Sequence, residues 1–394
     1  MTHSKFISLK KAVQIAILHS KRRKKATKID LANSLNYISS KEIRSPINLP
    51  ELDSAGLDGF IISNKKFAKF PVSSKIIETG KVYKNLNIKY AYRINTGAII
   101  PRNFKNFISL ENAFIEKELL ILSKSKISNK DIKKKGEDLK KKQILIKENQ
   151  KINFIRLALL ASVGIKKIEI HSPLKVGIVS TGNELINYKK KKKDFQTFDS
   201  NKLQIINFLK KYPISINDLG ILKDNYKDVE KFYRTNNSNY DIIISSGGSS
   251  FSSKDYTSSY LIKNTKILFQ YLRIQPGRPI IFAKQKRQYI FSLPGNPLAV
   301  MVNLKLIISK FFDSNNLYSN FKFENYKSGF DTNKKVNITK FIRVKIKGKI
   351  AYEHNSKGSA KLISTAQSDG LMIVEEGISK VVKGKSYPVI KFEI

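Results

Sequence analysis

The sequence predicts a multidomain α/β protein in which a central, mostly parallel α/β domain is combined with β-rich modules. Between residues 173 and 322, short apolar segments alternate with helical ones, which is the pattern of βαβ units. Residues 51–138 instead contain short β-branched and aromatic runs interrupted by Gly and Pro, which predicts a small β-rich domain. Residues 323–394 contain further strand-like runs, so we expect a compact, barrel-like C-terminal β domain.

The expected elements follow from these patterns in chain order. Residues 1–50 open with an apolar segment at 12–18 and a basic cluster at 21–25, and they end in a Pro-bounded extended stretch. A secretory signal would place a small-residue cleavage site where the basic cluster stands, so we expect an amphipathic helix of the fold, with a transit peptide as the alternative. Further on, we expect strands at 59–63, 85–93, 176–179, 241–245, 341–346 and 389–394, and helices at 202–210 and 298–312.

Composition indicates a folded chain with an unusual charge. The 394 residues include 74 Lys and Arg but only 31 Asp and Glu, a net charge of +43, while the hydrophobic fraction of 41% is that of a globular protein. Lys is spread along the whole chain together with abundant Ile and Asn, so compositional drift explains the charge better than a nucleic-acid partner does. Binding of a polyanion by the basic surface remains a weaker alternative.

Missing residue types exclude several kinds of site. The absence of Cys excludes disulfides, thiolate zinc sites, iron–sulfur clusters and a cysteine nucleophile, and the four His are scattered. No apolar run approaches 18 residues, so we expect a cytoplasmic protein without a membrane partner. A site in which carboxylates hold a hard cation is still compatible with this composition.

Three strand-to-helix corners are the candidate ligand sites. Thr181-Gly182 follows one expected strand, Ser246-Gly247-Gly248 follows a second, and Pro294-Gly295-Asn296-Pro297 opens the long apolar helix. Ligands of open α/β sheets collect at such corners, where backbone N–H groups favour anions. Carboxylates follow the first two corners, so the pattern favours a phosphate-bearing ligand with a divalent metal.

Acids are scarce in this chain, and five of them lie beside Gly or at expected element boundaries: Asp58, Asp138, Glu184, Asp224 and Asp255. For Asp138 and Asp224, a structural ion pair with Lys is an equally good interpretation. The sequence contains no G-x-G-x-x-G motif after a strand, no complete Walker loop and no G-x-S-x-G elbow. These absences argue against dinucleotide-binding, P-loop and serine-hydrolase functions.

The motifs resemble those of the molybdopterin molybdenumtransferases, the bacterial MoeA type related to the E domain of gephyrin. The similarity follows the family's order over almost the whole chain. The matching segments are 49–60 (LPELDSAGLDGF), 93–98 (RINTGA), 136–138 (GED), 180–185 (STGNEL), 246–248 (SGG) with 255–256 (DY), 275–279 (QPGRP) and 293–297 (LPGNP).

The resemblance implies an enzyme that inserts molybdate into adenylylated molybdopterin with Mg²⁺-dependent release of AMP. It places Asp58, Glu184 and Asp255 as catalytic acids nearest the metal. The implied substrate-binding residues are Thr96, Asp138, Thr181, Gly182, Asp224, Ser246, Gly247, Gly248, Arg278, Pro294, Gly295, Asn296, Pro297 and Ser359.

The resemblance also implies a domain organisation and an assembly. Residues 1–50 and 139–172 would form a discontinuous N-terminal domain, with 51–138 inserted as a β-rich domain, 173–322 as the molybdopterin-binding α/β domain and 323–394 as the C-terminal domain. The family fold is an elongated homodimer whose site lies between two subunits, so Asp58 and Thr96 would act in trans. A molybdopterin adenylyltransferase and molybdoenzyme acceptors are the other implied partners.

The chain departs from the family pattern at four positions. Asn183 replaces an Asp, Tyr271 and Gln275 replace frequent Lys residues, and Lys105 replaces an acid. The two lost cations would each contribute about 1 to 3 kcal/mol to an anion contact, unless Arg273 or Arg278 substitutes for them. A catalytically degenerate pterin-binding or scaffold paralogue is therefore the alternative function.

Overall fold

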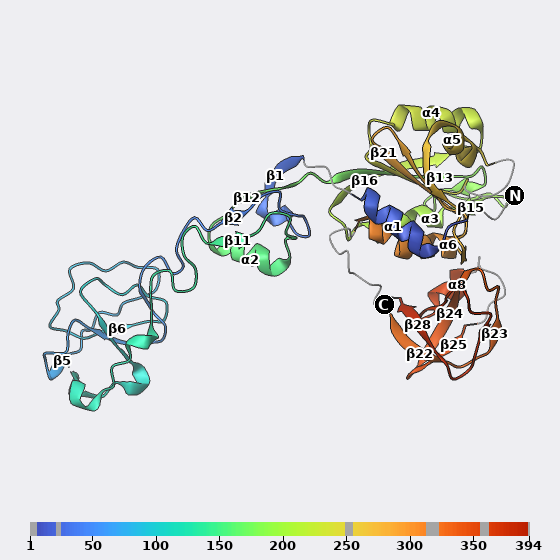
Figure 1. Cartoon of the computed structure of the whole chain (residues 1–394). Helices are drawn as coiled ribbons and strands as arrows, with labels where there is room; N and C mark the ends of the chain where they lie inside the picture. Colours follow the sequence, from blue (N-terminus) through green and yellow to red (C-terminus); the bar gives the residue numbers. More distant parts are fainter. Residues whose placement is uncertain (1–5, 21–24, 249–254, 313–322, 355–361, 393–394) are drawn as a thin grey trace. The chain divides into compact units, whose positions relative to one another are not determined.

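The computed structural model describes residues 6–20, 25–248, 255–312, 323–354 and 362–392 of the chain. The chain forms two compact units, one of residues 1–23 and 172–394 and the other of residues 24–171 (Figure 1). The sequence predicts residues 1–50 within one N-terminal domain, whereas residues 1–23 group with the α/β unit in the structure. Helix α1 (Leu9–His19) buries Ala12 and Ala16 in the core of the first unit, so its apolar face ties it to the α/β sheet.

The first unit contains the predicted α/β domain. Its six-stranded sheet has the order β16-β13-β17-β21-β20-β18, in which the first four strands are parallel and the last two join antiparallel. This confirms a central, mostly parallel sheet. The strands are β13 (Leu174–Thr181), β16 (Ile214–Leu222), β17 (Ile242–Ser246), β18 (Lys266–Gln270), β20 (Ile281–Gln285) and β21 (Gln288–Leu293). The helices are α3 (Ser200–Leu209), α4 (Tyr226–Asn236), α5 (Tyr256–Asn264) and α6 (Pro297–Asn303).

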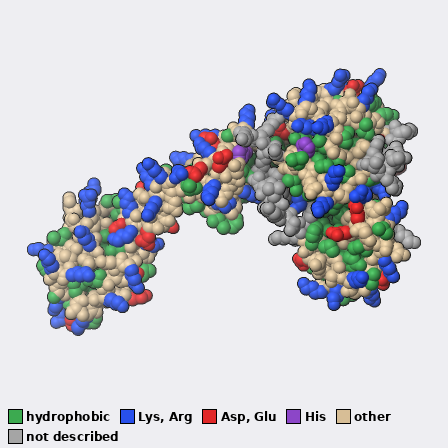
Figure 2. Space-filling view, viewed as in Figure 1, with side chains coloured by type: hydrophobic (Ala, Val, Ile, Leu, Met, Phe, Trp, Pro, Cys, Tyr) green, Lys and Arg blue, Asp and Glu red, His purple; other side chains and the backbone are tan. Residues whose placement is uncertain are grey.

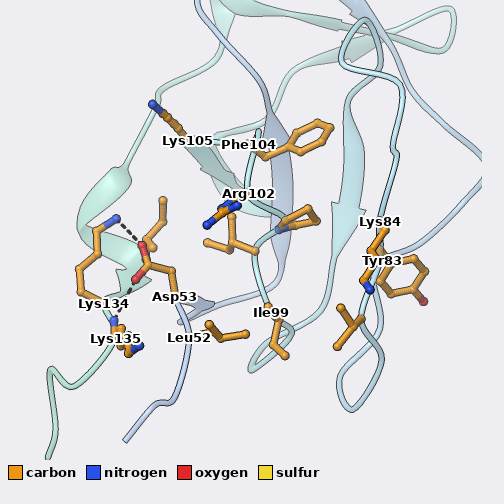
Figure 3. Close-up of a pocket in the computed structure, with 14 residues that line it drawn as sticks. Leu52, Asp53, Tyr83, Lys84, Ile99, Arg102, Phe104, Lys105, Lys134 and Lys135 are labelled. Atoms are coloured by element: carbon orange, nitrogen blue, oxygen red, sulfur yellow. Dashed lines mark hydrogen bonds and ion pairs between the residues drawn. The ribbon is translucent and has the colours of Figure 1, made fainter. Parts of the chain in front are cut away.

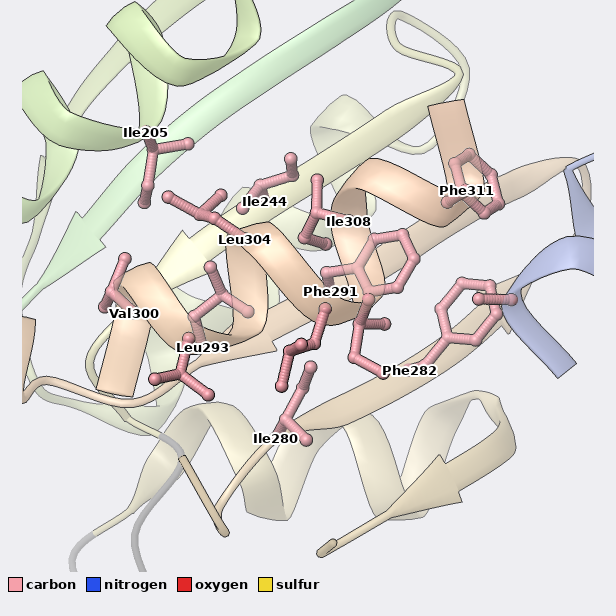
Figure 4. Close-up of a cluster of buried hydrophobic side chains, with 14 of the residues drawn as sticks. Ile205, Ile244, Ile280, Phe282, Phe291, Leu293, Val300, Leu304, Ile308 and Phe311 are labelled. Carbon is pink, nitrogen blue, oxygen red and sulfur yellow. The ribbon is translucent and has the colours of Figure 1, made fainter. Parts of the chain in front are cut away.

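Two hydrophobic clusters use the strands of this sheet, as expected for a parallel sheet buried on both faces. In the larger cluster, Phe282 and Phe291 stack with ring centroids 4.1 Å apart, and Phe311 packs edge-on against Phe291 (Figure 4). The expected helix 298–312 is present as α6, a π-helical stretch over Leu304–Ile308, and α7 (Ser309–Phe312). The cluster anchors the strands whose ends form the corners described below.

The C-terminal β domain is a closed barrel. The sheet order is β19-β24-β25-β22-β28-β26, and an additional pairing between β24 and β26 closes the ring. Of the strands expected at 341–346 and 389–394, the first spans Thr339–Lys347 and the second Ser386–Lys391, while residues 393–394 lie outside the described residues. The elements are β19 (Ile274–Gln275), β22 (Glu324–Ser328), β24 (Thr339–Lys347), β25 (Ile350–Glu353), α8 (Leu362–Ala366), β26 (Gly370–Val374) and β28 (Ser386–Lys391), with the short pair β23 (Thr332–Asn333) and β27 (Lys380–Val381).

The second unit begins and ends on paired strands. β1 (Ala26–Asp30) pairs antiparallel with β12 (Lys167–His171), and β2 (Ile43–Arg44) pairs with β11 (Ile144–Ile146) next to helix α2 (Phe154–Ser162). Between them lies the β-rich module, built from short strands as its Gly and Pro content predicts. Its strands are β3 (Ser54–Ala55), β4 (Gly59–Ile62), β5 (Lys69–Pro71), β6 (Tyr92–Ile94), β7 (Asn106–Ser109), β8 (Ile115–Glu116), β9 (Leu119–Ile121) and β10 (Ile132–Lys133).

One expected strand of the β-rich module is largely missing. Residues 85–93 were predicted to be extended, but a strand begins only at Tyr92, and Asn85 has a positive φ of 52°. Asn87 starts a local turn, since its side chain accepts a hydrogen bond from the backbone of Lys89 at 3.0 Å. Short polar side chains compete with the sheet ladder in this way.

Basic side chains are dispersed over the visible surface of both units (Figure 2). This dispersal fits the expectation that the net charge of +43 is a property of the whole chain. Among the described residues, no helix is long and apolar enough to cross a membrane.

Candidate functional site

The three predicted corners lie side by side at the carboxyl edge of the parallel sheet. Ser180 of β13 is in register with Ser246 of β17, and Ser246 is in register with Leu293 of β21. On the other side of β13, Thr181 is paired with Leu222, the last residue of β16. Four strand ends therefore meet at one edge, which is the usual ligand position of an open α/β sheet.

The corner after β17 forms a cradle at Gly248. Gly248 has a φ of +65°, and a Cβ there would lie 2.7 Å from Thr257 Oγ1 and 2.9 Å from Thr181 Oγ1. Both threonine side chains are buried, and within the described part of the chain neither hydroxyl has a hydrogen-bond partner. Buried hydroxyls are rarely left without a partner, so two of them facing one glycine indicate a place for a ligand acceptor atom.

Asn201 links the second and third corners. Its Nδ2 donates to Ser246 Oγ at 2.9 Å and to the carbonyl oxygen of Gly295 at 2.8 Å. Asn296 then caps α6, accepting hydrogen bonds from the backbone of Leu298 and Ala299, with Pro297 at the first helical position. The LPGNP segment thus has a local role as a helix start and a second role as a wall of the site.

Asn201 and Thr257 were missed from the sequence. Each lies in the first turn of a helix that follows a corner, α3 for Asn201 and α5 for Thr257. Polar residues are common in first turns, so nothing local distinguished them from ordinary helix starts. Only the sheet register, which brings distant strand ends together, shows their proximity to the corners.

Glu184 and Asp224 form an acidic pair at the ends of β13 and β16. The carboxylate of Glu184 lies against Gly182, where a Cβ would meet Oε1 at 2.7 Å. The backbone N–H of Asp224 donates to Asn183 Oδ1 at 3.1 Å, which holds the two segments together. Burial, and then the nearby negative charge of Glu184, raise the pKa of Asp224 above its ordinary value. Two neighbouring carboxylates of this kind favour a bound cation.

Asp255 is buried at the start of α5. Its Oδ1 accepts a hydrogen bond from the backbone of Ser258 at 2.9 Å, so it serves as the N-cap of the helix. Its charge reaches Tyr271, whose phenol pKa is raised first by burial and then by Asp255. The capping role fixes the carboxylate position within the site region.

Tyr271 and Arg278 both contact the N-terminal segment. Tyr271 is 8% exposed, has a φ of +58°, and places its ring 5.7 Å from that of Phe6. Arg278 lies over the ring of Phe6, with its guanidinium carbon 5.7 Å from the ring centroid. Arg273 also reaches this segment, donating from Nη1 to the carbonyl oxygen of Phe6 at 3.4 Å, but its Nε forms an ion pair with Glu376 at 3.2 Å. Of the two arginines expected to replace missing lysines, Arg278 is therefore the one not tied to a carboxylate among the described residues.

Asp58 and Thr96 of the second unit are directly bonded to each other. Asp58 Oδ1 accepts hydrogen bonds from both the backbone N–H and the hydroxyl of Thr96, each at 2.7 Å. The Thr96 hydroxyl, its backbone N–H and the positive charge of Arg93 hold the pKa of Asp58 below its ordinary value. Asp138 is exposed, and its backbone N–H donates to the carbonyl of Leu49 at 3.1 Å.

The predicted metal ligands are not gathered into one cluster within the described chain. Among the residues that the structure describes, no group of three or more His, Cys, Asp or Glu side chains is arranged to hold a metal ion. Glu184 and Asp224 approach each other, whereas Asp58 belongs to the second unit. Ser359 lies outside the described residues.

Comparison with known proteins accounts for nearly the whole chain. Residues 7–164 match the MoeA N-terminal region (domains I and II), residues 177–314 match a probable molybdopterin binding domain, and residues 325–392 match the MoeA C-terminal region (domain IV).

Individual relatives agree with these matches. The chain is 31% identical over 284 residues to the molybdopterin molybdenumtransferase of Haemophilus influenzae, covering 71% of this chain and 70% of that one. It is 26% identical over 311 residues to the enzyme of the same name from Staphylococcus aureus, covering 77% and 74%. The crystal structure of the molybdopterin biosynthesis MoeA protein from Pyrococcus horikoshii shares the fold, with a TM-score of 0.81 and 24% identity over 99% of this chain and 100% of that one. The chain therefore belongs to the molybdopterin molybdenumtransferase family, transferases of molybdenum cofactor biosynthesis.

Proposed function

We propose that the chain inserts molybdate into adenylylated molybdopterin, with Mg²⁺-dependent release of AMP. The observation that carries this proposal is the cradle at Gly248, where two buried threonine hydroxyls face a glycine beside the Glu184 and Asp224 pair. Hydroxyl donors suit phosphate or molybdate oxygens, and the acidic pair suits a divalent cation.

The residues present fit a magnesium ion. Mg²⁺ is usually held by one or two carboxylates together with substrate phosphate oxygens, so a pair without a third protein ligand is sufficient. Burial, and then the negative charge of Glu184, raise the pKa of Asp224 and so disfavour its ionised form, and a bound cation would relieve this. When bound, the ion would polarise phosphoryl oxygens and neutralise charge that develops on them.

The protein groups then have separate tasks. Thr181 and Thr257 donate hydrogen bonds to anionic oxygens over Gly248, and Asn201 keeps the Ser246 and Gly295 corners together. Asp255, fixed as the cap of α5, orients this side of the site. Asp58, kept ionised by Thr96, supplies a carboxylate from the partner subunit.

The test is AMP release by purified protein supplied with Mg²⁺, molybdate and adenylylated molybdopterin. We expect release by the natural chain and almost none by Asp255→Ala. Release unaffected by Asp255→Ala would overturn the site assignment. If the natural chain binds the pterin but releases no AMP at saturating molybdate, it is a non-catalytic member of the fold, the alternative that Asn183, Tyr271 and Gln275 motivate.

The homodimer is part of the same proposal. If Asp58 acts in trans, inactive Asp58→Ala and Asp255→Ala chains mixed and reassembled in equal amounts should regain about a quarter of the natural activity, because random pairing restores one complete site in each mixed dimer. A mixture that stays inactive while dimers exchange would show that both residues serve one chain.

Further partners and the location remain predictions. We propose that a molybdopterin adenylyltransferase supplies the substrate, that molybdoenzymes accept the product, and that these steps occur in the cytoplasm. Polyanion binding by the basic surface is the weakest alternative, and affinity for RNA that disappears by about 0.15 M salt would identify it as counterion electrostatics.

A further inference from the structure

The β-rich module contains a cavity that none of the residues assigned above lines. It has a volume of about 710 Å³, within the range of roughly 300 to 1,000 Å³ typical of small-molecule sites. Four chain segments surround it, and all belong to the second unit. Its lining residues are Leu52, Asp53, 82–84, 99–102, Phe104, Lys105, Ile132, Lys134 and Lys135.

The cavity lining is unusually basic even for this chain. Five of its fourteen residues are Lys or Arg, against 74 of 394 in the whole sequence. Lys134 is neutralised by Asp53, with Nζ and Oδ2 2.9 Å apart. Within the described residues, the side chains of the other four cations have no ion pair or hydrogen bond, namely Lys84, Arg102, Lys105 and Lys135.

Asp53 contacts both Lys134 and Lys135 on the basic side of the cavity. Besides the ion pair, its Oδ1 accepts a hydrogen bond from the backbone of Lys135 at 2.8 Å. The hydrogen bond from Lys134, the largest influence, holds the pKa of Asp53 below its ordinary value. The one carboxylate in the lining is therefore satisfied and leaves the remaining positive charge uncompensated. Figure 3 shows Arg102, Lys134 and Lys135 on the side of Asp53, with Tyr83 and Lys84 on the opposite side.

The rest of the lining is mostly apolar, and part of it is held in place by packing. Phe104 and Ile132 are buried to 3% and 4% exposure, and the Phe104 ring is held edge-on against Tyr92 at 5.4 Å. Ile99, Ile100 and Pro101 continue this surface. A cavity with an apolar floor and a cationic side suits a molecule that carries both a phosphate and a flat apolar body.

We propose that this cavity is a second ligand site, which binds a nucleoside phosphate or a similarly built organic phosphate. Its phosphate contacts Arg102, Lys105 and Lys135, and its ring system lies on the surface formed by Ile99, Pro101 and Phe104. The site is distinct from the sheet-edge site, because its lining residues all come from the second unit and include none of the residues assigned to the proposed reaction.

The test is a calorimetric titration of the full chain with ADP at about 0.15 M salt, where unspecific surface attraction is screened. We expect two ADP sites in the natural chain, one at the sheet edge and one in the cavity. Arg102→Glu with Lys105→Glu should weaken the cavity site roughly 100-fold, since two charge-assisted contacts become repulsive. Both side chains are exposed, so folding of this variant should be unchanged in a thermal melt.

The matched control is Lys65→Glu with Lys66→Glu, which makes the same charge change on exposed lysines of the same unit outside the cavity. This control should keep both sites. Equal losses in the two variants, or an unchanged titration of the cavity variant, would overturn the proposal. A Gly248→Ala chain should keep the cavity site alone, so failure of the cavity proposal can be told apart from failure of the proposed function.

A second arm uses inorganic pyrophosphate as the probe. Because pyrophosphate has no ring system, it should bind the cavity roughly tenfold more weakly than ADP does. Equal affinity would show that the apolar floor contributes nothing and would overturn the assignment of an organic phosphate.

Discussion

The sheet edge of the first unit and the loop that carries Asp58 in the second differ in how they hold a carboxylate. At the sheet edge, Asp224 lies beside Glu184 with a raised pKa, and the neighbouring threonine hydroxyls have no partner in the described chain. In the Asp58 loop, Thr96 supplies two donors and lowers the pKa. In the first arrangement, charge and hydroxyl groups lack partners among the described residues, whereas the Asp58 carboxylate is hydrogen-bonded within its own unit. Substitutions should therefore affect the two regions differently.

The largest effect is expected at Gly248. In Gly248→Ala, the new Cβ would meet two threonine hydroxyls at less than 3 Å, so AMP release should fall at least roughly 100-fold. The matched control is Gly384→Ala, because Gly384 also has a positive φ, +86°, but has open space around it. The control should cost about 1 kcal/mol of stability from backbone strain and keep full activity. Equal activity of the two variants would show that the cradle holds no ligand.

A smaller effect on activity is expected for Asp224→Asn, together with a gain in stability at neutral pH. The raised pKa means that the protonated acid is favoured in the folded state, so this contribution to stability is present below the ordinary pKa of 3.8 and is lost as pH rises through the folded-state pKa. At pH 7 the neutral amide should therefore raise the melting temperature, with no gain below pH 3.8.

The same substitution should weaken magnesium binding. The Mg²⁺ concentration for half-maximal AMP release should rise roughly tenfold in Asp224→Asn and also in Glu184→Gln. A variant that is more stable yet less responsive to Mg²⁺ would identify the pair as a cation site. An unchanged Mg²⁺ response in both variants would assign the pair a purely structural role.

Tyr271→Lys tests whether a missing cation limits the sheet-edge site. The added ammonium group would restore the cation that the family pattern commonly has at this position, so the molybdate concentration for half-maximal activity should fall by up to roughly tenfold. Loss of the ring contact with Phe6 should cost about 1 kcal/mol in unfolding experiments. The control is Tyr271→Phe, which keeps the aromatic ring and adds no charge. The molybdate concentration for half-maximal activity should not change in this variant.

The smallest effect is expected for Thr96→Val. This change removes the hydroxyl donor but keeps the backbone donor, so the pKa of Asp58 should move up toward its ordinary value of 3.8. Carboxyl NMR titration measures this shift directly, and AMP release should change only on the acid side of its pH profile. Thr96→Ser retains the hydroxyl and should behave like the natural chain. A Thr96→Val chain with an unshifted Asp58 would show that the backbone bond alone sets its ionisation.

Much of the fold and part of the site could be predicted from local sequence. The corners at Thr181, Ser246 and Pro294 were predictable because Gly, Ser and Pro that follow an apolar run indicate a turn at the end of a strand. The proximity of Asn201 and Thr257 depends on which strands are neighbours, and no local pattern encodes that order. The antiparallel strands β18 and β20 were also missed, since the sequence pattern emphasised repeated βαβ units.

The antiparallel pairing of β1 with β12 has a consequence for how the chain folds while it is being synthesised. Ala26 lies opposite His171, so the chain enters and leaves the second unit at adjacent points, as in a domain inserted into another domain. A ribosome releases helix α1 first, yet the strands that cover Ala12 and Ala16 emerge only after the whole insertion. The second unit can therefore fold before the sheet against which the apolar face of α1 packs has been synthesised. Completion of the α/β unit therefore depends on its last strands, and the apolar face of α1 stays exposed until they emerge.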